Sequence, residues 1–135
     1  MLMQWNDNLS SGTQIIDTQH QELIGRVNKL LEAFKHGVVT RQEVSSIIQY
    51  LTDYVVFHFG TEEKHMAVYS YPSMNNHKAQ HEQFVRTFLR LKDRIMMEGI
   101  NASLAEDVRQ IVVDWLVNHI KYSDRALGMY LKMKM

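Results

Sequence analysis

The segment VSSIIQYLTDYVVFHFGTEE (44–63) carries an apolar stripe that turns polar toward its end. Apolar residues recur every three or four positions, the spacing of one face of an α-helix, at Val44, Ile47, Ile48, Leu51 and Val55. The same face continues to His58 and Glu62, which are four residues apart. Because burying an imidazole or a carboxylate without a partner costs several kcal/mol, we expect these two side chains to meet polar groups from other helices.

Three other segments have the same helical spacing of apolar residues. The predicted helices span about residues 18–37, 40–66, 73–98 and 103–122, after an extended arm over about residues 1–17. The connections between them are short, and short connections make consecutive helices antiparallel neighbours. The sequence therefore predicts one all-α domain over residues 1–135, an antiparallel up-down-up-down four-helix bundle with an extended N-terminal arm.

Capping signals and a proline mark the predicted helix ends. Thr40 with Glu43, and Ser103 with Glu106, have the spacing of a capping box at a helix start. Pro72 separates the second helix from the third, because the residue before a proline disfavours the helical region. These signals place the starts of the second and fourth helices near residues 40 and 103.

Each predicted helix carries histidine or carboxylate side chains on its apolar face near one end. These residues are His20, His58, Glu62, His77, His81, His119 and Asp124. In an up-down-up-down bundle, the starts of the first and third helices and the ends of the second and fourth share one end of the molecule. A single buried histidine is more simply a hydrogen-bonded core residue, but convergence from four helices favours a metal site.

The spacing of His119 and Asp124 does not fit a regular helix. Residues five apart on an α-helix are about 140° out of phase, so the two side chains should not face the same point. Either the helix contains a π-bulge there, which is common at functional sites, or Asp124 lies just beyond a frayed helix end. The sequence leaves both alternatives open.

The set of candidate ligands narrows the choice of metal. Seven side chains are too many for one zinc ion, which takes four, and too few are carboxylates for calcium or magnesium. Imidazole combined with carboxylate suits a pair of iron, manganese or zinc ions, and bundle cores are known hosts for dinuclear carboxylate sites. A dinuclear centre bridged by Glu62 and Asp124 is therefore the natural arrangement.

Four stretches of this sequence resemble the signature stretches of the hemerythrin family. They are IIDTQHQEL (15–23), HFGTEEKHM (58–66), HKAQHEQF (77–84) and WLVNHIKYSD (115–124). The resemblance covers nearly the whole chain. In its length and single-domain layout, the chain resembles the bacterial branch of the family. It implies two iron ions, one held by His77, His81 and His119 and the other by His20 and His58, bridged by Glu62, Asp124 and a solvent-derived oxygen.

The resemblance also implies a function. With three bridges, the first iron has six ligands and the second has five, which leaves one open position for dioxygen. We therefore expect reversible dioxygen binding for storage, transport or delivery, without enzymatic turnover. The main alternative is an oxygen-sensing module of a larger signalling protein, and a di-iron peroxide or nitric oxide reductase ranks behind it.

Residues near the candidate ligands complete the predicted site. Trp115, Leu116 and Ile120 surround His119 in the sequence and are candidates to form the wall of a dioxygen pocket. For Glu63, which follows Glu62, the leading expectation is that it faces the solvent, and the alternative is that it caps the helix or supports a ligand from outside.

Charge and composition restrict the partners. The 15 basic and 15 acidic residues cancel to a formal net charge of +0, which gives no electrostatic footprint for nucleic acid or an anionic membrane. No apolar run approaches the roughly 20 residues that span a bilayer, and the N-terminus has no secretory signal. The absence of cysteine excludes disulfides and thiolate metal sites. We expect a cytoplasmic protein that binds dioxygen, and the sequence assigns no protein partner.

Overall fold

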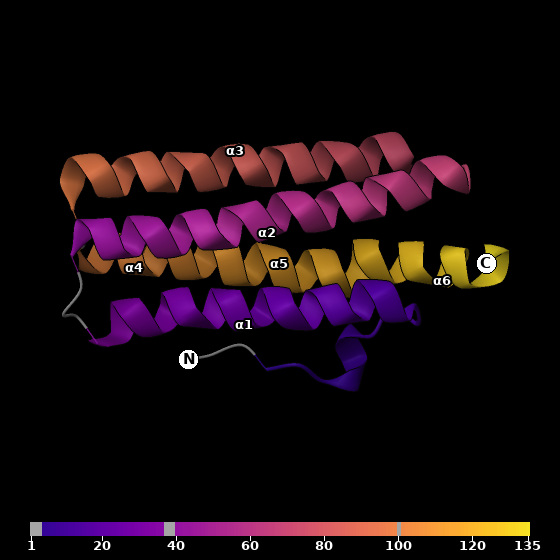
Figure 1. Cartoon of the computed structure of the whole chain (residues 1–135), viewed down its shortest axis with the longest axis horizontal. Coiled ribbons are helices and arrows are strands. Elements are labelled where there is room, and N and C mark those ends of the chain that lie inside the picture. The colour runs from indigo at the N-terminus through magenta and orange to yellow at the C-terminus, as the bar shows by residue number, and fades with distance from the viewer. Residues whose placement is uncertain (1–3, 37–39, 100) are drawn as a thin grey trace.

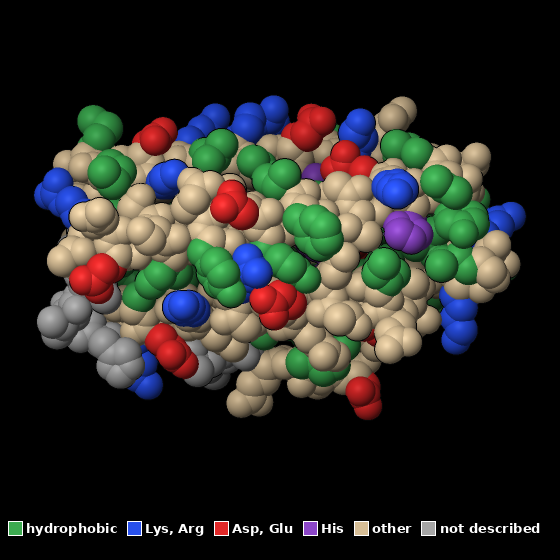
Figure 2. All heavy atoms as spheres, in the orientation of Figure 1, with side chains coloured by type: hydrophobic (Ala, Val, Ile, Leu, Met, Phe, Trp, Pro, Cys, Tyr) green, Lys and Arg blue, Asp and Glu red, His purple; other side chains and the backbone are tan. Residues whose placement is uncertain are grey.

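The structure is a computed structural model that describes residues 4–36, 40–99 and 101–135. Throughout these residues the regular structure is helical, and the helices lie side by side along the long axis of the molecule (Figure 1). None of the helices in the described residues has the length and apolarity needed to cross a membrane. On the face drawn in Figure 2, basic and acidic side chains are interspersed, in keeping with the balanced net charge.

Four long helical rods form the predicted antiparallel bundle. The first three are α1 (Gln14–His36), α2 (Arg41–Val68) and α3 (Met74–Glu98). The fourth rod runs from Ala102 to Lys134 and consists of α4 (Ala102–Val108), α5 (Trp115–Asn118) and α6 (Arg125–Lys134). Two π-helical turns, Arg109–Asp114 and His119–Asp124, join these three segments. The predicted fold class is therefore confirmed.

The first helix begins four residues earlier than predicted, so the arm is shorter than the expected residues 1–17. The Asp17 carboxylate accepts hydrogen bonds from the Ser10 hydroxyl at 2.6 Å, the Ser11 amide at 2.7 Å and the Ser11 hydroxyl at 2.8 Å. These contacts join the arm to the first turn of α1 and stabilise a helix start that the apolar pattern does not show. The predicted end at residue 37 lies outside the described residues.

The arm packs against α6. It contains a short 3-10 turn (Asp7–Leu9), and Trp5 packs against the core. The Thr13 hydroxyl donates to the Gly128 carbonyl at 2.9 Å. A Cβ atom at Gly128 would lie 2.3 Å from the Ser11 carbonyl oxygen, so only glycine lets the arm approach α6 this closely.

The fourth rod differs from its predicted range of 103–122 at both ends. Asn101, not Ser103, caps its start, and its side-chain oxygen accepts from the Leu104 amide at 2.8 Å. At its other end the rod continues twelve residues past 122, to Lys134. The helical pattern breaks at the π turn, so the sequence did not reveal this extension. The cap predicted at Thr40 is confirmed, because its hydroxyl accepts from the Glu43 amide at 3.1 Å.

Two separate apolar clusters fill the bundle. The larger one extends through most of its length and includes Leu23, Phe59, Phe84 and Ile120. The smaller one lies at one end and consists of the buried residues Ile16, Met66, Leu127 and Leu131. On three rods the chain passes from one cluster to the other within about two turns, and a candidate ligand lies between them: His20 on α1, Glu62 on α2 and Asp124 on the fourth rod.

Candidate metal centre

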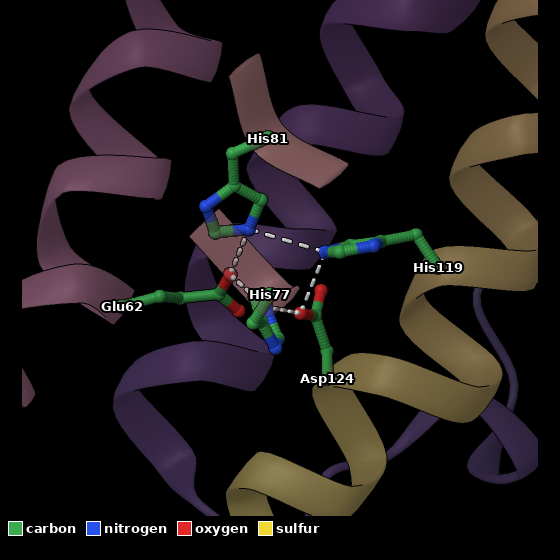
Figure 3. A group of neighbouring side chains, drawn as sticks. All are labelled: Glu62, His77, His81, His119 and Asp124. Carbon is green, nitrogen blue, oxygen red and sulfur yellow. Dashed lines mark hydrogen bonds and ion pairs between the residues drawn. The ribbon is translucent and has the colours of Figure 1, made fainter. Parts of the chain in front are cut away.

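The structure brings all seven predicted side chains into one buried layer, which we call the ligand layer. None of them is more than 4% exposed. The members are His20 from α1, His58 and Glu62 from α2, His77 and His81 from α3, and His119 and Asp124 from the second π turn. Five of them are drawn in Figure 3, where the three imidazoles and the two carboxylates point toward one another.

The ligand layer lies between the two apolar clusters. Along α1, Ile16 belongs to the small cluster and Leu23 to the large one, and His20 comes between them. Along the fourth rod, Ile120 belongs to the large cluster and Leu127 to the small one, with Asp124 between them. Apolar side chains therefore cover the layer on both sides along the bundle axis, which limits the access of water.

The layer divides into two groups that share both carboxylates. The three-histidine group contains His77, His81 and His119, and the two-histidine group contains His20 and His58. Each residue of a group contributes one nitrogen or oxygen atom, and all these atoms lie within 4.8 Å of one another.

Each shared carboxylate offers one oxygen to each group. Glu62 Oε1 lies 3.0 Å from His81 Nε2, whereas Glu62 Oε2 lies 3.5 Å from His58 Nε2. Asp124 Oδ1 lies 3.0 Å from His119 Nε2, whereas Asp124 Oδ2 lies 2.8 Å from His20 Nε2. This division of oxygens is the arrangement that two carboxylates need to bridge two metal ions.

The π turn between His119 and Asp124 explains their five-residue spacing. A π-helix closes a turn with more residues than an α-helix, so side chains five apart come back to one face. The helix continues without interruption into α6, so Asp124 does not lie beyond a frayed end. Of the two alternatives that the sequence left open, the π-bulge is correct.

Burial keeps two of the imidazoles neutral. It lowers the pKa of His58 to about 3, and together with the charge of His119 it lowers the pKa of His81 to about 2. Burial also opposes protonation of His20, but the hydrogen bond to Asp124 and the negative charges of Asp124 and Glu62 raise the pKa of that imidazole to about 9. His58 and His81 therefore have a lone pair available for a metal at neutral pH, and His20 must release a proton to bind one.

The two carboxyl groups differ in their tendency to ionise. Burial raises the pKa of Glu62, and the charge of Asp124 adds to this effect. Burial also acts to raise the pKa of Asp124, but the charge of His119 and the hydrogen bond from His20 hold it well below its usual range. The layer thus concentrates negative charge on Asp124.

Several polar atoms of the layer have no hydrogen-bond partner among the described residues. They include His58 Nε2 and Glu62 Oε2. Asp124 Oδ1 is also unbonded, although His77 Nε2 and His119 Nε2 lie 2.9 and 3.0 Å away. Each buried unpaired atom costs about 1–3 kcal/mol, so this layer is poorly satisfied by the protein alone. Nitrogen and oxygen atoms arranged in this way fit bound metal ions.

Three side chains outside the layer orient its imidazoles. Gln19 Oε1 accepts from His58 Nδ1 at 2.7 Å, and Gln80 Oε1 accepts from His119 Nδ1 at 2.9 Å. Glu63 Oε2 accepts from His81 Nδ1 at 3.1 Å. Each contact places the proton on Nδ1 and leaves Nε2 free to face the layer.

The sequence did not predict Gln19 and Gln80 as outer partners. For Glu63 the leading expectation, a solvent-facing side chain, is wrong, and the alternative of a supporting contact is correct, because the side chain is 26% exposed and contacts His81. Gln19 and Gln80 each precede a candidate ligand in the sequence, but adjacent residues on a helix do not face the same way. Their true partners lie on other helices, which only the packed bundle reveals.

Comparison with known proteins identifies the family. The family described as Hemerythrin HHE cation binding domain matches residues 11–131. The chain belongs to the hemerythrin family. Bacteriohemerythrin from Methylococcus capsulatus is 33% identical over 128 residues, which cover 94% of this chain and 95% of the relative. Bacteriohemerythrin from Stenotrophomonas maltophilia is 30% identical over 131 residues, which cover 97% of this chain and 82% of the relative.

Solved hemerythrin structures have the same fold. The crystal structure of a wild-type hemerythrin superimposes with a TM-score of 0.82 at 32% sequence identity. The match covers 97% of this chain and 98% of the solved chain. The part of the chain that matches the solved hemerythrin therefore contains all four rods and the ligand layer.

Aromatic and aliphatic side chains enclose this hemerythrin centre. The Trp115 ring stacks on His119 with centroids 4.5 Å apart, and the Phe59 ring stacks on His81 with centroids 3.8 Å apart. Leu116 and Ile120 are 1% and 0% exposed and belong to the large apolar cluster. Trp115 therefore packs beside the three-histidine group, and Leu116 and Ile120 are part of the apolar core.

Proposed function

We propose that this chain binds dioxygen reversibly at a non-haem di-iron centre, for oxygen storage, transport or delivery. In this proposal Glu62 and Asp124 bridge the irons, and the imidazoles divide between them as His77, His81 and His119 on one and His20 and His58 on the other. The single observation that carries the proposal is that each carboxylate offers one oxygen to each histidine group. When bound, the iron pair supplies the electrons that dioxygen takes up and returns.

The difference between the two groups supports a single site for dioxygen. The two-histidine group has one nitrogen donor fewer than the three-histidine group, so an iron held there would have one protein ligand fewer and could accept an external ligand. We propose that the apolar residues Leu116 and Ile120 exclude water from the space around the bound gas, whereas Trp115, which stacks on His119, covers the three-histidine group. Exclusion of water favours return of dioxygen over irreversible oxidation.

The residues of the layer favour a carrier over an enzyme. Each titratable side chain that the described structure brings into the layer is one of the seven proposed ligands. Because all seven would hold the irons, none of these seven side chains would be free to deliver protons in a peroxide or nitric oxide reductase cycle. Steady-state turnover with an added reductant would instead support that alternative.

A sensor role and the cellular location remain predictions from the sequence. An oxygen-sensing module would continue into helical signalling segments before Met1 or after Met135 in the full reading frame. The cytoplasmic location and the absence of nucleic-acid or membrane partners rest on composition and balanced charge.

The decisive experiment is an absorption spectrum of the iron-loaded protein. The protein is exposed to air, and its spectrum is recorded before and after the gas is removed. We expect a bridged di-iron spectrum that changes with oxygen and returns when oxygen is withdrawn. A spectrum that does not respond to the gas, or does not return, would contradict reversible binding.

We predict that azide binds the oxidised protein once per chain, at the iron held by His20 and His58. The reason is that only this iron lacks a sixth protein or bridging ligand. Titration of the oxidised protein gives the stoichiometry, and a crystal structure gives the position. Azide on the iron held by His77, His81 and His119 would contradict the assignment of the open position.

We predict that His77→Ala lowers the iron content and abolishes the bridged-pair spectrum. His77 Nε2 lies 3.3 Å from Glu62 and 2.9 Å from Asp124, so its loss removes a donor between both bridges. Iron analysis and absorption spectroscopy measure the result. The matched control is His65→Ala, because His65 hydrogen-bonds the Thr61 carbonyl outside the layer. Unchanged iron content in His77→Ala would remove His77 from the ligand set.

A further inference from the structure

The outer partners of the imidazoles are not equivalent. Gln19 and Gln80 accept from His58 and His119 through neutral amide oxygens, whereas Glu63 accepts from His81 through a carboxylate. Among the described residues, Glu63 is the carboxylate that accepts a hydrogen bond from the outer nitrogen of a layer imidazole. His81 therefore differs electrostatically from the other two imidazoles.

Two residues of α2 fix the ring of His81, which lies on α3. Phe59 stacks on the face of the ring, with centroids 3.8 Å apart and planes inclined by 4°. Glu63 binds the edge of the ring at Nδ1, 3.1 Å away. Phe59 and Glu63 are four residues apart, so they lie on one face of α2. This face holds His81 with its Nε2 atom toward Glu62, at 3.0 Å.

A surface groove between α2 and α3 gives water access to the outer side of this contact. The groove has a volume of about 480 Å³, and its lining includes Gly60, Glu63 and Val85. Gly60 lies one turn before Glu63, and a Cβ atom there would meet no atom within 4 Å, so packing does not require glycine at this position. The missing side chain leaves the groove open above Glu63, whose side chain is 26% exposed. The outer side of the Glu63 carboxylate is therefore in contact with water, while its inner side faces His81.

We propose that Glu63 is a positioning residue that makes His81 a stronger electron donor than the imidazoles backed by glutamine. This inference rests on the proposed di-iron function. A carboxylate on the outer nitrogen raises the basicity of an imidazole and fixes its orientation. A more basic ligand stabilises the ferric state relative to the ferrous state, so Glu63 lowers the reduction potential of the iron pair.

Three variants separate the charge of Glu63 from its hydrogen bond. Glu63→Gln keeps an acceptor oxygen and removes the charge, and Glu63→Ala removes both. The matched control is Glu82→Gln, because Glu82 lines the same groove and is exposed to solvent. The measurements are the midpoint potential of the iron-loaded protein and the rate at which a chelator removes its iron.

We expect Glu63→Gln to raise the midpoint potential and to retain iron as the parent does. Glu63→Ala should also raise the potential and should weaken iron binding by about 10–100-fold, the usual effect of losing an outer partner. Glu82→Gln should leave both quantities at the parent values, because an exposed charge is screened by solvent.

The inference is overturned if Glu63→Gln has the potential of the parent, or if Glu82→Gln shifts the potential by the same amount. Failure of the proposed function would look different. A parent protein that does not bind two irons per chain would remove the function itself. A parent that holds both irons, together with an unshifted Glu63→Gln variant, would remove only the role of Glu63.

Discussion

Removal of the metal should lower the melting temperature of this protein by roughly 10–20 °C. Without metal, buried atoms such as His58 Nε2 and Glu62 Oε2 have no hydrogen-bond partner. Metal bound only by the native state adds its binding energy to stability, about 4 kcal/mol at a free concentration 1,000 times the dissociation constant. For a chain of this size, each kcal/mol shifts the melting temperature by roughly 3–5 °C. Thermal unfolding of the metal-free and iron-loaded forms measures the difference.

The His77→Ala variant provides the control for this effect. Its melting temperature should respond much less to added iron, because it lacks one donor of the three-histidine group. Equal melting temperatures of the metal-free and iron-loaded parent protein would show that the ligand layer is satisfied without metal.

Leu116→Ala should destabilise the protein by about 2–5 kcal/mol and accelerate the irreversible loss of the oxygenated spectrum. Leu116 is 1% exposed, belongs to the large apolar cluster and precedes His119 by three residues. Both residues therefore lie on neighbouring positions of one helix face, and the shortened side chain leaves a cavity near the ligand layer. Water in that cavity would promote oxidation of the irons. Chemical denaturation measures the stability, and absorption spectroscopy follows the oxygenated form.

Leu104→Ala separates the two effects of this substitution. Leu104 is also 1% exposed and lies in the same apolar cluster, but on α4, toward the opposite end of the bundle from α6 (Figure 1). The Leu104→Ala variant should lose about as much stability as Leu116→Ala, but its oxygenated form should oxidise at the parent rate. Equal oxidation rates in Leu116→Ala and the parent would limit Leu116 to a packing role.

The bundle and its ligand layer were predictable from the sequence because both depend on helical periodicity. His58 and Glu62 continue the stripe of Val55, and the other layer histidines continue their own stripes in the same way, whereas Asp124 joins the layer only through the π turn. Antiparallel packing then brings the polar ends together. This reasoning needs only the period of the helix and the short connections between the rods, and both can be read from neighbouring residues of the chain.

The features that the sequence did not reveal depend on packing between rods. Gln19, Gln80 and Glu63 reach imidazoles on other helices, and their rotamers depend on the assembled bundle. The end of the fourth rod was placed too early because the π turn interrupts the apolar period. Leu127 and Leu131, which close the small cluster beside the layer, lie beyond that interruption.

Because of the π turn between His119 and Asp124, α6 shares the axis of α5 but differs from it in helical phase. One additional residue corresponds to about 100° of helical rotation. Loss of the turn would therefore rotate Asp124 away from the layer and, in the same motion, rotate Leu127 and Leu131 of α6 away from Ile16 and Met66. The orientation of a bridging carboxylate and the closure of the apolar end are thus set together by a single backbone offset.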